Sequence, residues 1–509
     1  TGVSDYMDWS LEQEDTRVIA LFLETVRDPV AFVETLKKAN RKNIPVVVLK
    51  IGKSARAVTM ALSHTGAIAG EHTAFAAMCR RYGVISVDDF DEMAAILMLL
   101  QVQPQSVPGG FAAIFESGGF RELITDLAEQ IGLDFAEIED STRMALVEHL
   151  DPGLKAENPL DAWGSQQRFE ERFAACLRLM MQDPNVAGGA FITNFRDGYY
   201  LSEAIYRAVE LVSREVAKPL ALVNLYSDLA NNDLCERARQ AAIPIIDGAR
   251  ESLLAFKRLF HYQKFMRSHQ SPLPGLLIDE AKTQACLRRL AGLEGEPPGE
   301  AEALLLLADF SIAVAPSIKL DKVTDLEEAA RNLGFPLVLK TAESGILHKS
   351  DSRGVYLDIK TPAELLDKYR DLEQRLGAKA VVSPMIEAGV EVALGTLNDV
   401  QFGPVIMVAA GGVLVELLED RAFALCPVDA AEAEAMLVSL KLDAVLKGMR
   451  GQAAVNRQAL IEIIVGLSQF AFAMREQIAE IDINPVLVNQ QHALAVDALI
   501  ISKPVEASC

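Results

Sequence analysis

Strand-like apolar runs alternate with amphipathic helical segments in the first part of the sequence, and this alternation limits the fold more than any other feature. Within residues 17–103 the predicted strands and helices are, in chain order, Val18–Leu23, Asp28–Lys42, Ile44–Lys50, Ala74–Tyr82, Val84–Val87 and Met93–Leu100. Strands that are separated by helices predict a parallel sheet with helices on both of its faces. We therefore expect an α/β fold.

A second α/β unit follows Gln101–Gly110, a segment whose two prolines and two glycines are typical of a linker. Its predicted elements are the strand Phe111–Phe115, the helix Phe120–Ile131 and the strands Gly189–Thr193, Pro219–Asn224 and Pro244–Ile246. This unit ends near Phe260. Residues 261–300 are polar and helical, then rich in glycine and proline, and we interpret them as a connector.

The last part of the chain shows a different order of elements. We predict strands and helices at Pro336–Lys340, Ala363–Leu376, Ala380–Pro384, Glu391–Leu397, Val405–Val408 and within 430–477, with paired strands at the end. A chain of 509 residues is too long for one hydrophobic core. The predicted domains are residues 1–103, 108–260 and 301–509, with the connector at 261–300.

Charge and apolar patterning exclude two classes of partner. The net charge is −22, and so acidic a surface repels the phosphate backbone of nucleic acids. The longest apolar run, Phe402–Val415, is interrupted by glycines and a proline and is too short to span a membrane. The sequence has no signal peptide and no close pair of cysteines, so we expect reduced thiols in a cytoplasmic protein.

His64 is the first candidate for catalysis. Its neighbours Ser63, Thr65 and Gly66 are small, so a large anionic group has room to approach the imidazole. Glu24 ends the strand Val18–Leu23 and is placed to hold the other ring nitrogen, because strand ends meet at the ligand-binding edge of a parallel sheet. The alternative is a histidine packed within a turn of small residues.

Ser117, Gly118 and Gly119 stand between a predicted strand and a predicted helix. The free N–H groups at a helix start favour a phosphate, and glycines let the ligand approach the backbone. A glycine pair at such a turn also occurs for geometry alone.

Two further residues suit phosphate chemistry. Lys340 ends an apolar strand, from which its amine can reach nucleotide phosphates, although surface lysines at strand ends are common. His348 lies in the loop segment His-Lys-Ser-Asp, with Gly345 and Gly354 nearby. The alternative interpretation of that loop is an ordinary solvated turn.

Asn484 and Asp497 form a candidate magnesium site. Two adjacent antiparallel strands would bring these two oxygen-bearing side chains together. Magnesium takes few protein oxygens and shares the rest of its coordination with phosphates and water. A hairpin with polar ends is the alternative.

Several motifs in one order resemble a single family, the NDP-forming acyl-CoA synthetases, which include ADP-forming acetate–CoA ligase and succinyl-CoA synthetase. The motifs are Ser-His-Thr-Gly-Ala (63–67), Asn-Pro-Leu-Asp (158–161), His-Lys-Ser-Asp (348–351), Phe-Gly-Pro-Val (402–405), Gly-Gly-Val-Leu-Val-Glu (411–416) and Asp-Ile-Asn-Pro (482–485). The resemblance extends over the whole chain. It implies two flavodoxin-like domains followed by an ATP-grasp domain.

The resemblance also implies a role for each candidate residue. His64 corresponds to the transiently phosphorylated histidine, Glu24 to the carboxylate that orients it, and His348 to a second histidine that carries phosphate. The helix start at Ser117, Gly118 and Gly119 corresponds to the group that stabilises the phosphohistidine. The remaining correspondences are ATP-binding positions at Lys340, Pro384, Met385 and Glu391 and magnesium ligands at Asn484 and Asp497.

The implied activity is that of an ADP-forming acid–CoA ligase that uses ATP, Mg²⁺ and coenzyme A. The alternatives are a degenerate acyl-CoA-sensing regulatory module and an ATP-dependent lyase that uses the same activation. Family members usually begin with a CoA-binding domain that is not recognisable here, so we expect a missing N-terminal part or another subunit to supply it. The resemblance implies a homo-oligomer or a dependence on that domain. Arg353 stands where the family typically has glycine.

The carboxylic acid is the least defined substrate. Aromatic residues that follow predicted strands in the second unit would suit an aryl acid such as a hydroxycinnamate; these are Trp163, Phe195, Tyr199 and Tyr200. The same residues also suit a hydrophobic core, and a short aliphatic acid is an equal alternative.

Overall fold

The computed structural model describes residues 1–53, 72–102, 106–164, 168–268, 278–293, 297–343, 352–412, 420–449 and 453–503. The chain divides into two compact units, one formed by Thr1–Ala69 with Tyr82–Leu273 and the other by Gly70–Arg81 with Pro274–Cys509. His64 and His348, the two predicted phosphate-carrying histidines, lie outside the described residues.

The first unit contains a small parallel sheet in the order β1-β2-β3, formed by Ile19–Leu23, Val46–Lys50 and Ile85–Val87. Its helices are α1 (Val3–Leu11), α2 (Pro29–Arg41) and α5 (Phe90–Leu100). The Asp28 side chain caps α2 by accepting from the Ala31 N–H, and Pro29 opens that helix where a missing N–H costs nothing.

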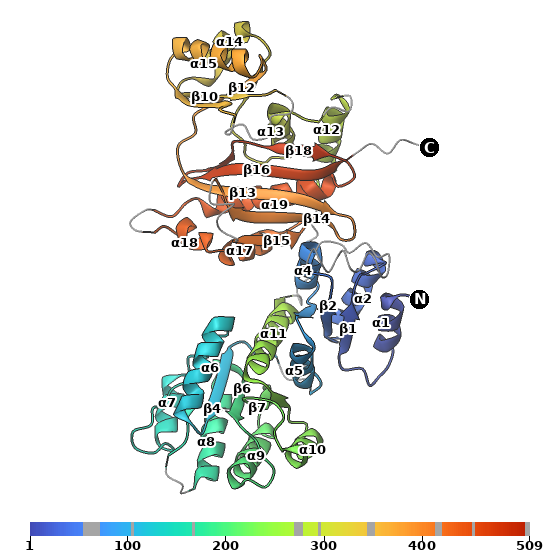
Figure 1. Cartoon of the computed structure of the whole chain (residues 1–509), viewed down its shortest axis with the longest axis vertical. Coiled ribbons are helices and arrows are strands. Elements are labelled where there is room, and N and C mark those ends of the chain that lie inside the picture. Colours follow the sequence, from blue (N-terminus) through green and yellow to red (C-terminus); the bar gives the residue numbers. More distant parts are fainter. Residues whose placement is uncertain are drawn as a thin grey trace. The chain divides into compact units, whose positions relative to one another are not determined.

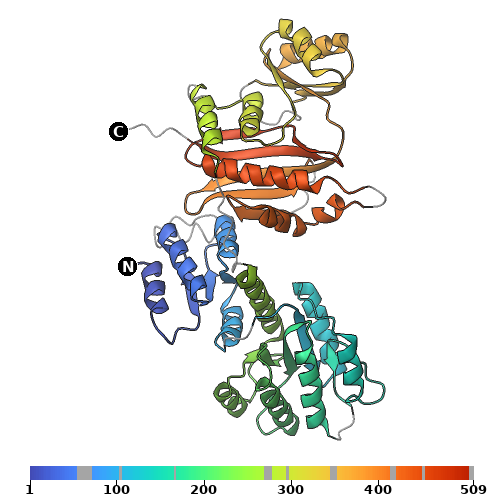
Figure 2. The same ribbon diagram turned by 180° about the vertical axis from the view of Figure 1, so that it is seen from behind.

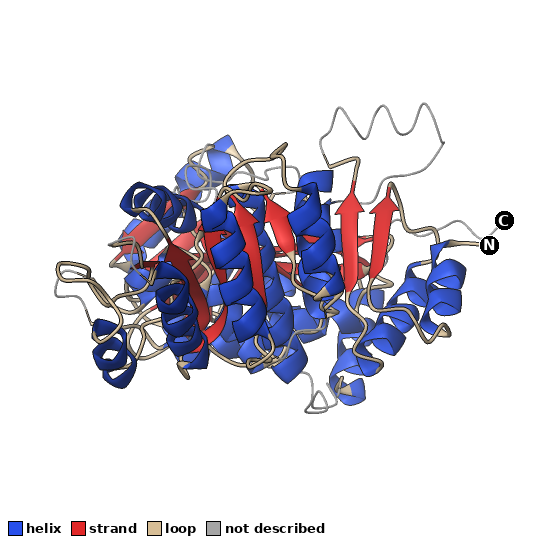
Figure 3. Ribbon diagram, turned by 90° about the horizontal axis from the view of Figure 1, so that it is seen from below, coloured by secondary structure: helices blue, strands red, loops and turns tan. Residues whose placement is uncertain are grey.

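The second sheet of this unit has the order β5-β4-β6-β7-β8, and every pair in it is parallel. Its strands are β4 (Gly110–Phe115), β5 (Leu160–Asp161), β6 (Val186–Thr193), β7 (Leu220–Asn224) and β8 (Ile245–Asp247). Its helices are α6 (Gly118–Ile131), α7 (Asp140–Val147), α8 (Phe169–Gln182), α9 (Tyr200–Ser213), α10 (Asn232–Gln240) and α11 (Ala249–Ser268). Helices cover both faces of the strands (Figure 3).

Alternate residues of the second sheet enter two different cores, as the period of two along a strand requires. Ala112 and Ile114 of β4 face one core, which α8 and α9 complete. Phe111, Ala113 and Phe115 face the other core, which also contains residues of β2, β3, α5 and α11. The two parallel sheets therefore share one hydrophobic core through α5 and α11.

The second unit is built on a six-stranded antiparallel sheet in the order β15-β14-β13-β16-β17, with β18 also paired to β16. The strands are β13 (Val390–Asp399), β14 (Gly403–Ala410), β15 (Arg421–Leu425), β16 (Ile478–Val488), β17 (Ala493–Ala495) and β18 (Leu499–Ser502). Helices α4 (His72–Arg81), α12 (Glu280–Ala291), α13 (Glu300–Asp309), α17 (Ala430–Val438), α18 (Leu442–Leu446) and α19 (Arg457–Ala473) complete this layer. The long helix α19 lies across one face of the sheet (Figure 2).

A smaller antiparallel sheet in the same unit has the order β11-β10-β12-β9 (Figure 1). Its strands are β9 (Ile318–Leu320), β10 (Leu337–Thr341), β11 (Val355–Ile359) and β12 (Ala380–Pro384), and it is covered by the short helix η1 (Val323–Asp325), α14 (Leu326–Leu333) and α15 (Pro362–Arg375). Tyr369 is fully buried here and donates a hydrogen bond from its hydroxyl to the Ala378 carbonyl at 2.8 Å.

The predicted α/β fold class is confirmed, and the predicted strands lie within a few residues of those observed. The predicted domain limits remain predictions. Within the predicted connector, α11 continues to Ser268, and α12 contributes the fully buried Cys286 to the core of the second unit. The contacts group α4 with the second unit, since Arg81 pairs with Glu432 at 2.8 Å.

Candidate active site

Lys340 is the centre of a buried charged cluster in the second unit. Its amine donates to the Glu300 Oε1 atom at 2.8 Å, to the Val496 carbonyl at 2.8 Å and to the Asp497 Oδ2 atom at 3.1 Å. Lys340 lies on β10, Glu300 is the first residue of α13, and Asp497 lies between β17 and β18. Three elements that are distant in sequence therefore meet at one amine.

The environment of Lys340 keeps it charged. Burial lowers the pKa of its amine, but the carboxylates of Glu300 and Asp497 outweigh that effect, so the pKa lies above its ordinary value. Only 8 % of Lys340 is exposed. A permanently positive group beside a partly exposed carboxylate suits the binding of phosphate oxygens.

The strand register brings Asn484 and Asp497 opposite each other, as the sequence predicts. Val486 pairs with Ala495 on one side, and Asp482 pairs with Leu499 on the other, so the same register places Asn484 across from Asp497. The Asn484 side-chain oxygen also accepts from the Gly412 N–H at 3.3 Å. These two oxygens fit magnesium, a hard cation that takes one or two protein oxygens together with phosphates and water. No group of three or more His, Cys, Asp or Glu side chains that could hold a metal by itself occurs in the described ranges.

Gly412 connects the predicted ATP-binding residue Glu391 with this site. The Gly411 N–H donates to the Glu391 carbonyl at 2.8 Å. A Cβ atom at Gly412 would lie 2.0 Å from the Glu391 Oε2 atom, and the backbone there has a φ of +62°. The backbone conformation favours glycine, and a larger residue would also displace the Glu391 carboxylate.

The other predicted ATP-binding residues, Pro384 and Met385, lie at the end of β12. The Met385 N–H donates to the Pro336 carbonyl at 2.8 Å, which joins this strand end to the start of β10. Met385 is 39 % exposed, so its side chain is open to a ligand. The assignment of Pro384 and Met385 to ATP binding stays a prediction.

Arg353 adopts a backbone φ of +50°, in the left-handed region that favours glycine. The resemblance implies glycine at this position, and the observed conformation explains that preference. The Arg375 side chain stabilises the turn by donating to the Arg353 carbonyl at 3.0 Å and to the Ser352 carbonyl at 3.3 Å.

In the first unit, Glu24 lies at the carboxyl end of β1, where the sequence predicts it. The buried Lys50, at the end of β2, donates from its amine to the Glu24 carbonyl at 2.7 Å and to the Ile51 carbonyl at 2.9 Å. Burial lowers the pKa of this amine, and Lys53 adds to that effect while Glu24 opposes it. Lys50 therefore ties together the two strand ends next to the segment that carries His64.

Ser117 is the N-cap residue of α6, as predicted, and Gly118 and Gly119 are the first residues of that helix. The Ser117 side chain makes no capping hydrogen bond within the described structure. A Cβ atom at Gly118 would lie 3.2 Å from the Asp161 Oδ2 atom, so the carboxylate of the last β5 residue stands at the helix start. The helix dipole favours a carboxylate at this position.

Glu116 follows β4 directly, beside that helix start, and no prediction from the sequence included it. Thr193, at the end of β6, donates its hydroxyl to the Glu116 Oε1 atom, while the Oε2 atom is buried without a partner in the described part of the chain. Burial raises the pKa of Glu116, and the nearby Asp161 carboxylate raises it further, against the lowering effect of the Thr193 hydrogen bond. Its only signal in the sequence is its position after a buried strand.

The Glu116 carboxyl predicts a dependence of stability on pH. A carboxyl with a raised pKa binds its proton more tightly in the folded state, so stability falls as the pH rises from about 4.5 through the folded pKa. Glu116→Gln cannot ionise but keeps an acceptor for Thr193. We expect the variant to gain stability relative to wild type over this pH rise, as measured by urea unfolding. The exposed Glu122→Gln on α6 is the control, and an equal pH dependence in both variants would contradict the assignment.

The predicted aromatic residues lie after β5 and β6, but they do not share one environment. Phe195 is fully buried in the core, which is one of the two alternatives that the sequence leaves open for it. Trp163 and Tyr200 each pack against Phe169, with ring centroids 6.0 Å and 5.9 Å apart. Tyr199 and Tyr200 are 44 % and 53 % exposed, and their centroids lie 5.0 Å apart. A continuous row of rings therefore lies at the same sheet edge as Ser117, formed by Trp163, Phe169, Tyr200 and Tyr199.

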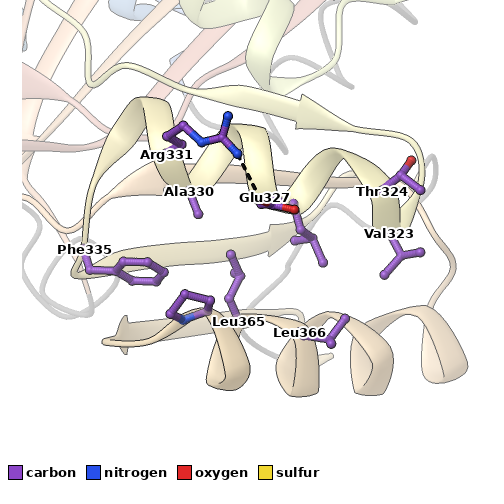
Figure 4. Close-up of a pocket in the computed structure, with 10 residues that line it drawn as sticks. Val323, Thr324, Glu327, Ala330, Arg331, Phe335, Leu365 and Leu366 are labelled. Atoms are coloured by element: carbon purple, nitrogen blue, oxygen red, sulfur yellow. Dashed lines mark hydrogen bonds and ion pairs between the residues drawn. The ribbon is translucent and has the colours of Figure 1, made fainter.

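A pocket of 530 Å³ lies elsewhere in the second unit, between α14 and α15 (Figure 4). It is mainly apolar, with Phe335 and Leu365 among its walls, and one ion pair joins Glu327 to Arg331 at 2.9 Å. None of the predicted site residues lines it. The charged cluster around Lys340 is therefore the better candidate for chemistry.

Sequence reasoning found Lys340 and Asp497 and missed Glu300, because Glu300 follows a glycine- and proline-rich segment that gives no sign of a site. Lys50 was also missed, although it ends an apolar predicted strand in the same way as Lys340. No helix in the described residues has the length and apolar character to cross a membrane.

Comparison with known proteins confirms the predicted flavodoxin-like start and ATP-grasp end of the chain. Residues 1–100 match the family described as the succinyl-CoA ligase like flavodoxin domain, and residues 296–501 match the ATP-grasp domain. The trans-feruloyl-CoA synthase FCS1, from an unknown prokaryotic organism, is 30 % identical over 516 residues, which cover 98 % of this chain and 71 % of that protein.

A second curated protein and a solved structure are also similar to this chain. The ADP-forming acetate–CoA ligase I of Archaeoglobus fulgidus is 28 % identical over 503 residues, covering 97 % of this chain and 71 % of its own. A solved structure of the dinucleotide-forming acetyl-coenzyme A synthetase 1 of Ca. Korarchaeum cryptofilum, with coenzyme A and Ca-AMPCP, is 30 % identical. The match covers 43 % of this chain and 98 % of the synthetase chain, with a TM-score of 0.40.

Proposed function

This chain belongs to the ADP-forming acyl-CoA synthetase family, and from that premise we propose that it joins a carboxylic acid to coenzyme A while ATP is converted to ADP and phosphate. The observation that carries the proposal is the buried Lys340 amine beside Asp497, with Asn484 opposite in the strand register. A fixed cation next to two oxygen ligands is what a triphosphate and its magnesium ion require.

The first step is phosphoryl transfer to a histidine. A ring nitrogen of His348 attacks the γ-phosphorus, the bond to the β-phosphate oxygen breaks, and ADP leaves. Lys340 neutralises charge on the phosphate oxygens, while Asn484 and Asp497 are the residues that would hold magnesium. Bound magnesium would supply further neutralisation of that charge.

The next steps move the phosphoryl group to the acid. His64 accepts it from His348, with Glu24 holding the other ring nitrogen, and the helix start at Ser117, Gly118 and Gly119 stabilises its negative charge. A carboxylate oxygen of the substrate then attacks phosphorus, giving an acyl phosphate and a free imidazole. The thiolate of coenzyme A attacks the acyl carbon, phosphate leaves, and the thioester forms.

We further propose an aryl acid as substrate. The chain of rings from Trp163 to Tyr199 lies at the sheet edge that also holds Ser117, and partly exposed tyrosines suit contact with an aromatic ring. The match to a trans-feruloyl-CoA synthase supports the same choice. Partners beyond the substrates, and the oligomeric state, stay predictions.

The test is a two-part assay. The chain is first incubated with γ-labelled ATP and magnesium, and we expect an acid-labile, base-stable phosphoryl group on the protein. A panel of aryl and short aliphatic acids is then added, and loss of the label is followed. Release by aryl acids supports the full proposal, release by acetate alone overturns the substrate class, and a chain that never takes up label favours a regulatory module.

A further inference from the structure

A second pocket, of 310 Å³, lies in the first unit at the amino-terminal ends of β4 and β6. This is the edge opposite to the one that carries Ser117, because β4 and β6 are parallel and Ser117 follows the carboxyl end of β4. One wall is the last part of α11 and another is the turn at Gly132 after α6. Its volume is at the lower end of the range for small-molecule sites.

The wall formed by α11 is positively charged. Lys257, His261 and Lys264 recur at the spacing of one helix face, and Arg267 continues it by one turn. The Lys257 amine donates to the Ile131 carbonyl at the end of α6, and the Arg267 guanidinium donates to the Ser106 hydroxyl at 2.7 Å. All four basic side chains line the same pocket.

This positive charge is not neutralised within the described residues. No ion pair joins Lys257, Lys264 or Arg267 to a carboxylate there, although the chain has 71 acidic and only 49 basic residues. The single carboxylate among the lining residues is that of Asp134. Three permanent positive charges thus face one negative charge in a protein whose net charge is −22.

The His261 imidazole is subject to the same excess of positive charge. Its pKa is lowered by burial and by the like charges of Lys257, Lys264 and Arg258. Like charges gathered around one side chain favour an anion in the same space.

We propose that this pocket binds a small phosphorylated anion, held by Lys257, Lys264 and Arg267. A phosphate or diphosphate group would accept charge-assisted hydrogen bonds from Lys264 and Arg267 and would remove the excess positive charge. The bound anion would contact α11 and lie next to the Ser106 segment and the end of α6. This site is separate from the proposed ATP and phosphohistidine chemistry. Its source is free phosphate, a nucleotide or the phosphates of coenzyme A.

The experiment follows the His261 imidazole resonance of the whole chain by NMR, assigned with His261→Asn, during titration with four probes. The probes are inorganic phosphate, pyrophosphate, ADP and coenzyme A, which distinguish the sources. We expect at least one probe to raise the pKa of His261, and we expect Lys264→Ala with Arg267→Ala to weaken that probe about tenfold or more. The matched control is Arg41→Ala with Lys155→Ala, which removes two exposed charges of the same unit.

A His261 resonance that no probe moves, or that moves equally in the double variant, overturns the proposal. If the double variant does not fold, Lys264→Gln and a comparison of pyrophosphate with chloride at equal ionic strength in wild type provide the same test. Phosphoryl labelling from ATP is measured in every variant. If labelling is normal but no probe binds the pocket, only the proposed anion site is refuted. If a probe binds the pocket but no labelling occurs, only the proposed function is refuted.

Discussion

Lys340→Met is expected to reduce phosphoryl labelling from ATP by about 10³-fold and to lower the free energy of unfolding by about 3–5 kcal/mol. The activity falls because the cation that faces the phosphates is lost. The stability falls because the buried Glu300 carboxylate loses its ion pair with the Lys340 amine, which lies 2.8 Å away. Labelling with γ-labelled ATP and urea unfolding measure the two effects.

Two further variants separate catalysis from folding. Lys340→Met combined with Glu300→Gln also removes the buried charge that has lost the Lys340 amine, so we expect most of the stability to return while labelling stays low. The matched control is Lys319→Met, since Lys319 is 44 % exposed and its nearest carboxylate oxygens lie 3.7 Å and 3.9 Å away. Its stability is expected to change by less than about 1 kcal/mol. A Lys340→Met protein that is labelled at the wild-type rate would refute the assigned role.

His64→Asn is expected to lower acyl-CoA formation by on the order of 10⁴-fold or more, because it removes the nucleophile that passes the phosphoryl group to the acid. Two histidines in series predict a specific pattern. His348→Asn is expected to take up almost no label from ATP. His64→Asn is expected to take up label on His348 but to keep it when the acid is added.

The measurement is a pulse of labelled ATP followed by a chase with acid, with the phosphorylated residue identified by mass spectrometry. His492→Asn is the matched control, because His492 lies in the hairpin between β16 and β17 and contacts Asn489. It should behave as wild type. Label that chases normally from His64→Asn would show that the phosphoryl group does not pass through His64.

Much of this fold follows from local pattern. The buried strands β2, β6 and β10 are continuous apolar runs, and such runs bounded by turns are predictable because burial of both faces demands apolar residues at every position. Short or half-exposed strands such as β15 were missed, since their pattern is weak. The placement of α4 with the second unit has no sequence signal, because an amphipathic helix does not specify which sheet it covers.

By itself the sequence determined the fold class, the family and the residue types at the candidate site, because these depend on hydrophobic period and on motifs whose members are close in sequence. Tertiary structure alone decided that Glu300 and Asp497 share the Lys340 amine and that Glu116 is buried beside Thr193. It also decided that Phe195 belongs to the core rather than to a pocket. The physical reason is that hydrogen bonds and burial depend on distances between elements far apart in the chain, and no local pattern encodes those distances.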